Sequence, residues 1–272
     1  MSDQVDPAAT KAMVADVFSA SAPTYDQVID FFGPFGRALV AAADPPRGAD
    51  VLDVACGRGA CLFAALDAVG PGGSVVGIDL AEGMVAALAA DLEHRGVVNA
   101  SVRVGDAEAI DLPDASVDVV TAGFMIFFTP EPDAVLREFR RVLRPGGAVA
   151  LSTFDGDVPS KWLRSIGEEL FGPSDPRPSE AYDMADVLEP ALAAAGFADI
   201  VGTDVHEPLV FADVAEVERW HRSHFARLML EVLDDDQLAI YRQRVAEHLE
   251  PTRTDRGYQL VQRARLTTAR AI

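Results

Sequence analysis

Asp53 and two glycines stand close together at the end of a short apolar run, in Val51-Leu52-Asp53-Val54-Ala55-Cys56-Gly57-Arg58-Gly59. The run predicts a strand, the glycines predict a tight loop, and the alanine-rich residues that follow predict a helix. Gly57 and Gly59 can adopt positive φ and let a ligand approach the main chain without a Cβ in the way. Such a strand, loop and helix start is where α/β sheets hold nucleotide-like ligands.

The spacing of this loop disfavours a dinucleotide. The dinucleotide fingerprint needs a third glycine three residues after Gly59, and Leu62 stands there. Asp53, just before the loop, would repel a pyrophosphate but could serve a cationic ligand. A dehydrogenase is therefore the least favoured function.

A second acid, Asp79, lies in the second predicted strand, Ser74–Leu80. An acid at that strand end can accept hydrogen bonds from both hydroxyls of a ribose. As a helix N-cap it would instead bind the backbone of the next helix, predicted over Ala81–Arg95. We favour ribose binding. Met84, in the first turn of that helix, packs either on an adenine face or in the core.

Three motifs resemble a known family. Asp53–Gly59 resembles the glycine-rich motif of class I S-adenosylmethionine-dependent methyltransferases, in the branch of the ubiquinone/menaquinone-type enzymes (methyltransferase type 11). Gly105-Asp106-Ala107-Glu108, followed by Leu112-Pro113, resembles the family motif that contacts the adenine amino group. The turn Arg144-Pro145-Gly146-Gly147, with the helix and strand around it, also resembles the family. The resemblance ends near Asp155.

The resemblance implies S-adenosylmethionine as the cofactor. Asp106 would accept from the adenine amine, the Ala107 N–H would meet the ring, and Tyr25 would reach the cofactor's carboxylate. A tyrosine that packs a helix against the core explains Tyr25 equally well. No metal is expected, because no cluster of acids follows the fourth strand. By position, the implied cofactor contacts are Tyr25, Asp53, Ala55, Gly57, Gly59, Asp79, Leu80, Met84, Asp106, Ala107 and Gly123.

The acceptor side departs from a common family pattern. Many relatives carry a histidine pair after the fourth strand, whereas this chain has Phe124-Met125-Ile126-Phe127-Phe128. This wall is apolar and offers no base. Helical spacing after Asp213 places His221 and His224 on one face with apolar residues, so we predict His224 first, then His221, as a general base. Phe124, Phe128 and Trp220 are the predicted acceptor contacts, although buried histidines more often only bond a neighbour.

The elements that position these residues predict an α/β fold. We expect a Rossmann-like sheet of seven strands, mostly parallel with the last strand antiparallel, with helices on both faces. Residues 1–48 form a helical cap, 49–155 the cofactor-binding core, and 156–272 the part that completes the sheet. A helical lid is inserted at about 213–250, broken near Asp234-Asp235-Asp236.

The composition limits the classes of molecule that this protein can bind. The net charge of −20 argues against nucleic acid and against an anionic membrane surface. No apolar run is long enough to span a bilayer, and the N-terminus lacks a signal peptide pattern. We expect a cytoplasmic protein with a small-molecule acceptor. The sequence allows a homodimer but does not decide the assembly.

The predicted activity is O-methylation of a small, largely apolar or aromatic metabolite in natural-product metabolism. One alternative is an enzyme on the same scaffold that catalyses another reaction, such as a cyclisation. Another is a non-catalytic protein that binds the cofactor for regulation. The intact set of Asp53, Gly57, Gly59, Asp79 and Asp106 argues for cofactor binding, which by itself is not catalysis.

Overall fold

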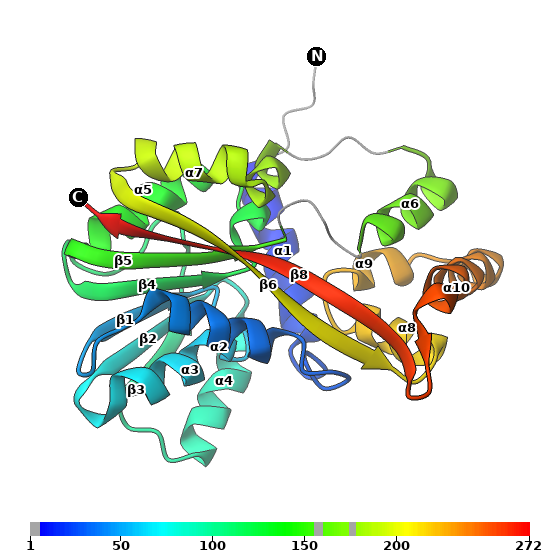
Figure 1. Ribbon diagram of the computed structural model, residues 1–272, viewed down its shortest axis with the longest axis horizontal. Helices are drawn as coiled ribbons and strands as arrows, with labels where there is room; N and C mark the ends of the chain where they lie inside the picture. The colour runs from blue at the N-terminus through cyan, green and yellow to red at the C-terminus, as the bar shows by residue number, and fades with distance from the viewer. Residues whose placement is uncertain (1–5, 155–159, 174–177) are drawn as a thin grey trace.

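The computed structural model describes residues 6–154, 160–173 and 178–272 (Figure 1). Its strands are β1 (Asp50–Val54), β2 (Ser74–Asp79), β3 (Ala100–Val104), β4 (Val117–Gly123), β5 (Leu143–Thr153), β6 (Phe197–Phe211), β7 (Arg253–Thr254) and β8 (Gly257–Ala271). They form one sheet in the order β3-β2-β1-β4-β5-β8-β6, and the two-residue β7 pairs with β8 in addition. Strands β1 to β5 are mutually parallel, and β8 runs antiparallel to both β5 and β6. The predicted seven-stranded topology is confirmed, with β7 as a short addition.

Helices cover both faces of the sheet. They are α1 (Pro7–Ser21), α2 (Phe32–Ala43), α3 (Ala60–Val69), α4 (Glu82–His94), α5 (Pro132–Val142), α6 (Ser160–Phe171), α7 (Ala185–Ala194), α8 (Val214–Arg222), α9 (Arg227–Leu230) and α10 (Asp235–Leu249). Short 3₁₀ helices span Gly70–Gly72, Ile126–Phe128, Pro178–Asp183 and Glu250–Thr252. In Figure 1, α2, α3 and α4 lie below the sheet, while α5 and α7 lie above it. No helix along the described ranges is both long and apolar enough to cross a bilayer.

Apolar runs form the inner strands because both faces of the sheet are covered. On β1, Val51 packs into the core beneath α2 and α3, and Leu52 into the core on the opposite face. Leu62, which breaks the dinucleotide pattern, is fully buried in α3. It therefore serves helix packing and leaves the loop above β1 open to a ligand.

Strand β6 runs through Pro208 without a break, although proline is rare inside strands. Pro208 pairs in register with Val261 of β8. Strand β6 is the edge of the sheet, where alternate N–H groups point away from any partner and a proline removes no ladder bond. The long strand therefore extends the sheet past the core.

The lid lies between β6 and β8, at the tip of the two strands (Figure 1). Helices α8, α9 and α10 fill the predicted range, and Asp234 begins α10 with a capping box to Gln237. Helix α6 joins them, since Glu169 pairs with Arg244 of α10 at 2.8 Å. The lid thus draws on two separate parts of the chain. The predicted boundary at residue 155 lies outside the described residues.

Candidate functional site

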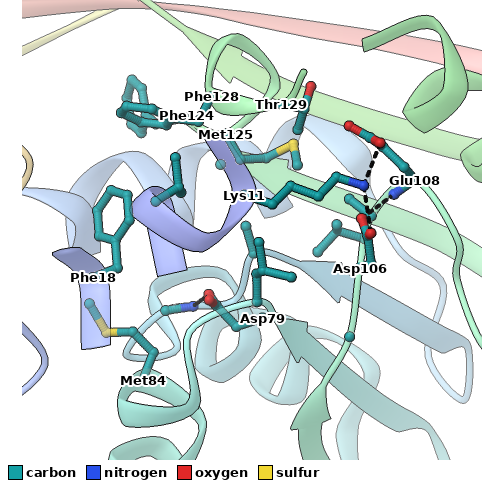
Figure 2. A pocket seen from close by; sticks show the side chains of 18 of the residues that line it. Lys11, Phe18, Asp79, Met84, Asp106, Glu108, Phe124, Met125, Phe128 and Thr129 are labelled. Atoms are coloured by element: carbon teal, nitrogen blue, oxygen red, sulfur yellow. Dashed lines mark hydrogen bonds and ion pairs between the residues drawn. The ribbon is translucent and has the colours of Figure 1, made fainter. Parts of the chain in front are cut away.

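One cavity, named the main cavity because most of the predicted cofactor residues line it, opens at the carboxyl ends of β1, β2 and β4, beneath α1 (Figure 2). The predicted cofactor residues that line it are Tyr25, Ala55, Gly57, Asp79, Leu80, Met84, Asp106, Ala107 and Gly123. Asp53 lines a second, inner cavity described below, and Gly59 lines neither of these two cavities. Residues that the sequence did not mark, among them Lys11, Phe18, Met125 and Thr129, complete the lining.

Asp79 is held by backbone on both carboxylate oxygens. Its Oδ2 accepts from the Gly57 N–H at 2.8 Å and its Oδ1 from the Ala81 N–H at 2.9 Å. Gly57 has φ +51°, which suits a glycine and presents its N–H to the acid. Burial raises the pKa of Asp79, and the two N–H groups oppose that rise. Asp79 therefore meets backbone at the start of α4 and lines the cavity, and each oxygen keeps a lone pair for a ligand hydroxyl.

Lys11 of α1 reaches across the main cavity to Asp106 (Figure 2). Its Nζ lies 2.7 Å from Asp106 Oδ2 and 2.5 Å from Glu108 Oε2. The other Asp106 oxygen accepts from the Glu108 N–H at 2.9 Å. Burial disfavours the charged form of Lys11. The carboxylates of Asp106 and Glu108 together outweigh this effect, so the pKa of Lys11 is raised. A ligand amine at Asp106 has to share that carboxylate with Lys11.

An inner cavity adjoins the main one. Its lining comprises Tyr25, Asp26, Phe32, Gly36, Asp53, Ala55, Cys56, Gly57, Arg58, Ala60, Cys61, Gly123, Phe124 and Ser152. Tyr25, Ala55, Gly57, Gly123 and Phe124 border both cavities. One elongated ligand can therefore pass from one cavity into the other along Gly123.

Asp53 is the buried acid of the inner cavity, 1% exposed. Its Oδ1 accepts from the Thr121 hydroxyl at 2.8 Å, while its Oδ2 is buried without a hydrogen bond from any described residue. Burial raises the pKa of Asp53 to about 7. A buried carboxylate oxygen with no donor is costly, and a cationic ligand group would satisfy it.

Gly59 has a structural role in the loop. It lines neither of these two cavities, has φ +87° and immediately precedes α3. A Cβ there would lie 2.8 Å from Leu88 Cδ1 and 2.9 Å from Phe63 Cε2. The need for glycine at this position thus comes from packing and backbone conformation.

The acceptor wall begins at Phe124, which has the left-handed φ of +52°. Its N–H bonds the Ser152 carbonyl at 3.0 Å and the Ser152 hydroxyl at 3.1 Å. Its ring stacks on Phe154 at 4.5 Å between centroids. A bulky residue in this conformation is strained, so β5 fixes Phe124 at the junction of the cavities.

Phe128 connects the main cavity to the lid. Its ring lies 5.5 Å from Phe18 of α1 and 4.8 Å from Phe225 of the lid, measured between centroids. Arg227 of the lid also donates to the Ala20 carbonyl at 2.8 Å. Helix α1 and the lid therefore meet over the end of the cavity.

The two candidate bases lie in the lid against Trp220, and Trp220 itself, a predicted acceptor contact, lines neither the main nor the inner cavity. Neither histidine lines the main cavity. His221 is buried, and its Nδ1 lies 2.7 Å from the Tyr241 hydroxyl. His224 lies 4.8 Å from Trp220 between ring centroids. Burial lowers the pKa of His221 well below its usual value and that of His224 to about 4.

The expected single helix through these histidines was wrong in one respect. Helix α8 ends at Arg222 because Ser223 folds back on it, with both its N–H and its hydroxyl bonded to the Trp220 carbonyl. His224 and Phe225 therefore stand in the loop between α8 and α9.

No group of three or more metal-ligating side chains occurs within the described part of the chain.

Comparison with known proteins agrees with this site. A family model for a methyltransferase domain matches residues 51–147. Nocamycin O-methyltransferase of Saccharothrix syringae is 38% identical over 82% of this chain and 86% of its own length. Aklanonic acid methyltransferase of Streptomyces sp. (strain C5) is 40% identical over 53% of this chain and 66% of its own. The crystal structure of the YcgJ protein of Bacillus subtilis has a TM-score of 0.61 at 19% identity, covering 88% of this chain and 98% of that one.

The fold and the comparisons define a Rossmann-like methyltransferase. The chain belongs to the class I S-adenosylmethionine-dependent methyltransferases. The residues present fit that cofactor: Asp79 and Asp106 suit an adenosine, and the unsatisfied Asp53 Oδ2 suits the ammonium of its amino-acid end.

Proposed function

We propose that this methyltransferase transfers the methyl group to an oxygen of a small, largely apolar or aromatic natural product. The observation that carries the proposal is the aromatic wall of the main cavity, where Phe124 borders both cavities and Phe128 contacts Phe225 of the lid. The names of nocamycin O-methyltransferase and aklanonic acid methyltransferase support the same chemistry.

The bound cofactor supplies an electrophilic methyl group, so the protein mainly has to align the acceptor and exclude water. Phe124, Phe128 and Phe18 provide a dry wall beside that group. The indole N–H of Trp220 is buried without a partner among the described residues. An acceptor oxygen that entered the lid beside Trp220 would meet this donor, although Trp220 lines neither cavity.

His224 is the proposed general base, and His221, bonded to Tyr241, is the second choice. The low pKa of His224 means that its imidazole is neutral at pH 7 and able to take a proton, though with little driving force. We expect His224→Ala to lower turnover by about tenfold or more, with the affinity for S-adenosylhomocysteine unchanged. Steady-state assays of product formation measure this, and unchanged turnover in the variant would refute the role.

The activity itself is tested with the purified protein, S-adenosylmethionine and a panel of hydroxylated polycyclic aromatics and aromatic acids. Mass spectrometry follows methylated product together with S-adenosylhomocysteine. A rearranged acceptor without S-adenosylhomocysteine would support a cyclisation instead, and cofactor binding without any product would support a regulatory protein. Asp79→Ala serves as the inactive control.

We further propose that the enzyme acts in the cytoplasm, in keeping with its acidic composition. A homodimer is the proposed assembly. Light scattering of the purified protein would give the mass that distinguishes a monomer from a dimer.

A further inference from the structure

Helix α1 touches both the main cavity and the lid, and no motif assigned a role to either contact. We propose that α1 transmits the presence of the cofactor to the lid, and that Arg227 is the positioning residue through which it does so. The lid is then held in place more firmly when the cofactor is bound. This inference goes beyond the proposed function, because it needs the cofactor and makes no use of the acceptor.

Helix α1 is only lightly anchored to the rest of the protein. Of its 15 residues, Val17 alone is both apolar and buried. The apolar cluster at its C-terminal end is small and separate from the two large cores, and its buried members are Ala22, Ala81 and Met84. Elements with few buried apolar contacts open at a low cost in free energy. The position of α1 can therefore respond to a ligand.

A cofactor in the main cavity adds contacts to this helix. Lys11, Val14 and Phe18 line the cavity, and their spacing places them on one face of α1. Lys11 and Phe18 project from this helix beside the cavity in Figure 2. A ligand that binds there covers part of these side chains, and so it stabilises α1 in the position that the structure shows.

The last turn of α1 makes the contact with the lid. Arg227, the first residue of α9, donates to the Ala20 carbonyl at 2.8 Å. Carbonyl groups in the last turn of a helix lack a partner further along the helix and attract positive charge, and α1 has no basic residue of its own there. Next to this bond, the Phe18 ring lies 6.2 Å from the Phe225 ring, measured between centroids. Phe18 therefore borders the cavity and packs against the lid.

The lid segment that receives these contacts has little support of its own. Phe225 lies in the loop between α8 and α9, and α9 has 4 residues, of which Leu230 is the buried one. The position of this segment thus depends on partners outside it, and α1 is one of them. The candidate base His224 belongs to the same loop, so its placement depends on α1 as well.

The alternative is a fixed contact that only packs α1 against the lid. A fixed contact protects the backbone of the lid equally with and without the cofactor. The proposed role instead makes this protection depend on the ligand, although the ligand lies in the main cavity. Protection measured in both states therefore distinguishes the two.

The experiment is hydrogen–deuterium exchange read by mass spectrometry, without ligand and with saturating S-adenosylhomocysteine, whose affinity for each protein is measured by calorimetry. The test variant is Arg227→Gln. Glu231→Gln is one control, because it removes the ion pair that Arg227 makes within the lid and leaves the bond to Ala20. Arg219→Gln is the other control, since Arg219 is an exposed arginine of α8 that pairs with Glu216 of the same helix. Exchange of α10 without ligand shows whether the lid is folded in each protein.

We expect S-adenosylhomocysteine to slow exchange at residues 221–231 by about fivefold or more in the wild type and in both controls. In Arg227→Gln it should leave exchange of that segment unchanged, while α1 is protected in all four proteins. Arg227→Gln should also bind S-adenosylhomocysteine about fivefold more weakly, because coupling between two sites is reciprocal.

Lid protection in Arg227→Gln equal to that in the wild type would overturn the proposal, as would a wild type that binds S-adenosylhomocysteine without slower exchange in the lid. An equal loss in Glu231→Gln would assign the effect to the ion pair inside the lid and would overturn it too. Fast exchange of α10 in unliganded Arg227→Gln would make the contact structural, against the proposal. A wild type that does not bind S-adenosylhomocysteine would instead contradict the cofactor assignment.

Discussion

Asp79→Ala is expected to lower the affinity for S-adenosylhomocysteine by about a hundredfold or more, because each hydrogen bond to a charged group contributes strongly. The substitution removes the acceptor for the ribose hydroxyls. It also frees the Gly57 and Ala81 N–H groups, which now bond the carboxylate at 2.8 Å and 2.9 Å. The loop and the start of α4 thus lose their shared anchor. Titration calorimetry of both proteins gives the ratio of affinities.

Asp114→Ala is the matched control for this variant. Asp114 is an exposed acid that pairs with Arg141 and does not line the main cavity, so its loss should leave the affinity unchanged. Thermal unfolding without ligand checks that the Asp79 variant is folded. Retention of wild-type affinity by a folded Asp79→Ala protein would contradict the assignment of the ribose site.

Asp53→Asn should have two large and opposite effects. At pH 8 the unliganded variant should be more stable than the wild type by about 2 kcal/mol, because the substitution removes a buried negative charge of which one oxygen, Oδ2, has no donor among the described residues. Its affinity for S-adenosylhomocysteine should fall by about tenfold or more, because the ammonium loses a charged partner. Function at this position would then come at the expense of stability.

The stability gain at residue 53 should depend on pH. Burial raises the pKa of Asp53 in the folded protein to about 7, above its ordinary value of 3.8. The wild type therefore loses stability as pH rises from about 4 through 7, where the unfolded chain releases the proton more readily. The difference in melting temperature between the two proteins should be large at pH 8 and shrink toward pH 5. A variant that melts below the wild type at pH 8 would contradict this account.

The core of the fold could be predicted because its elements are specified locally. The helix expected after the glycine loop is α3, at residues 60–69, because an alanine-rich segment after a glycine specifies a helix. The apolar run at residues 117–123 forms β4 because both faces of the sheet are covered. The cofactor acids follow from strand ends, which the sequence marks. Periodicity and motif order thus sufficed to predict that Asp79 and Asp106 would lie at one cavity.

Other features depend on contacts that no local pattern reveals. Lys11 meets Asp106 across 95 positions of chain, and only the packing of α1 over the cavity brings them together. The end of α8 was missed because the Ser223 hydroxyl competes with the helix for the Trp220 carbonyl. A signal existed there, since serine favours helix ends, but the apolar spacing through Phe225 was the stronger pattern.

The pairing of β6 with β8 has an evolutionary consequence. Residues 205–211 pair with residues 258–264, beyond the six β8 residues that pair with β5. Helices α8, α9 and α10 of the lid are therefore carried on a two-stranded ribbon and attached to it at two adjacent points. Recombination near residues 212 and 256 would exchange these three helices between relatives in one step. New acceptors could be acquired in this way while the nucleotide half is inherited intact.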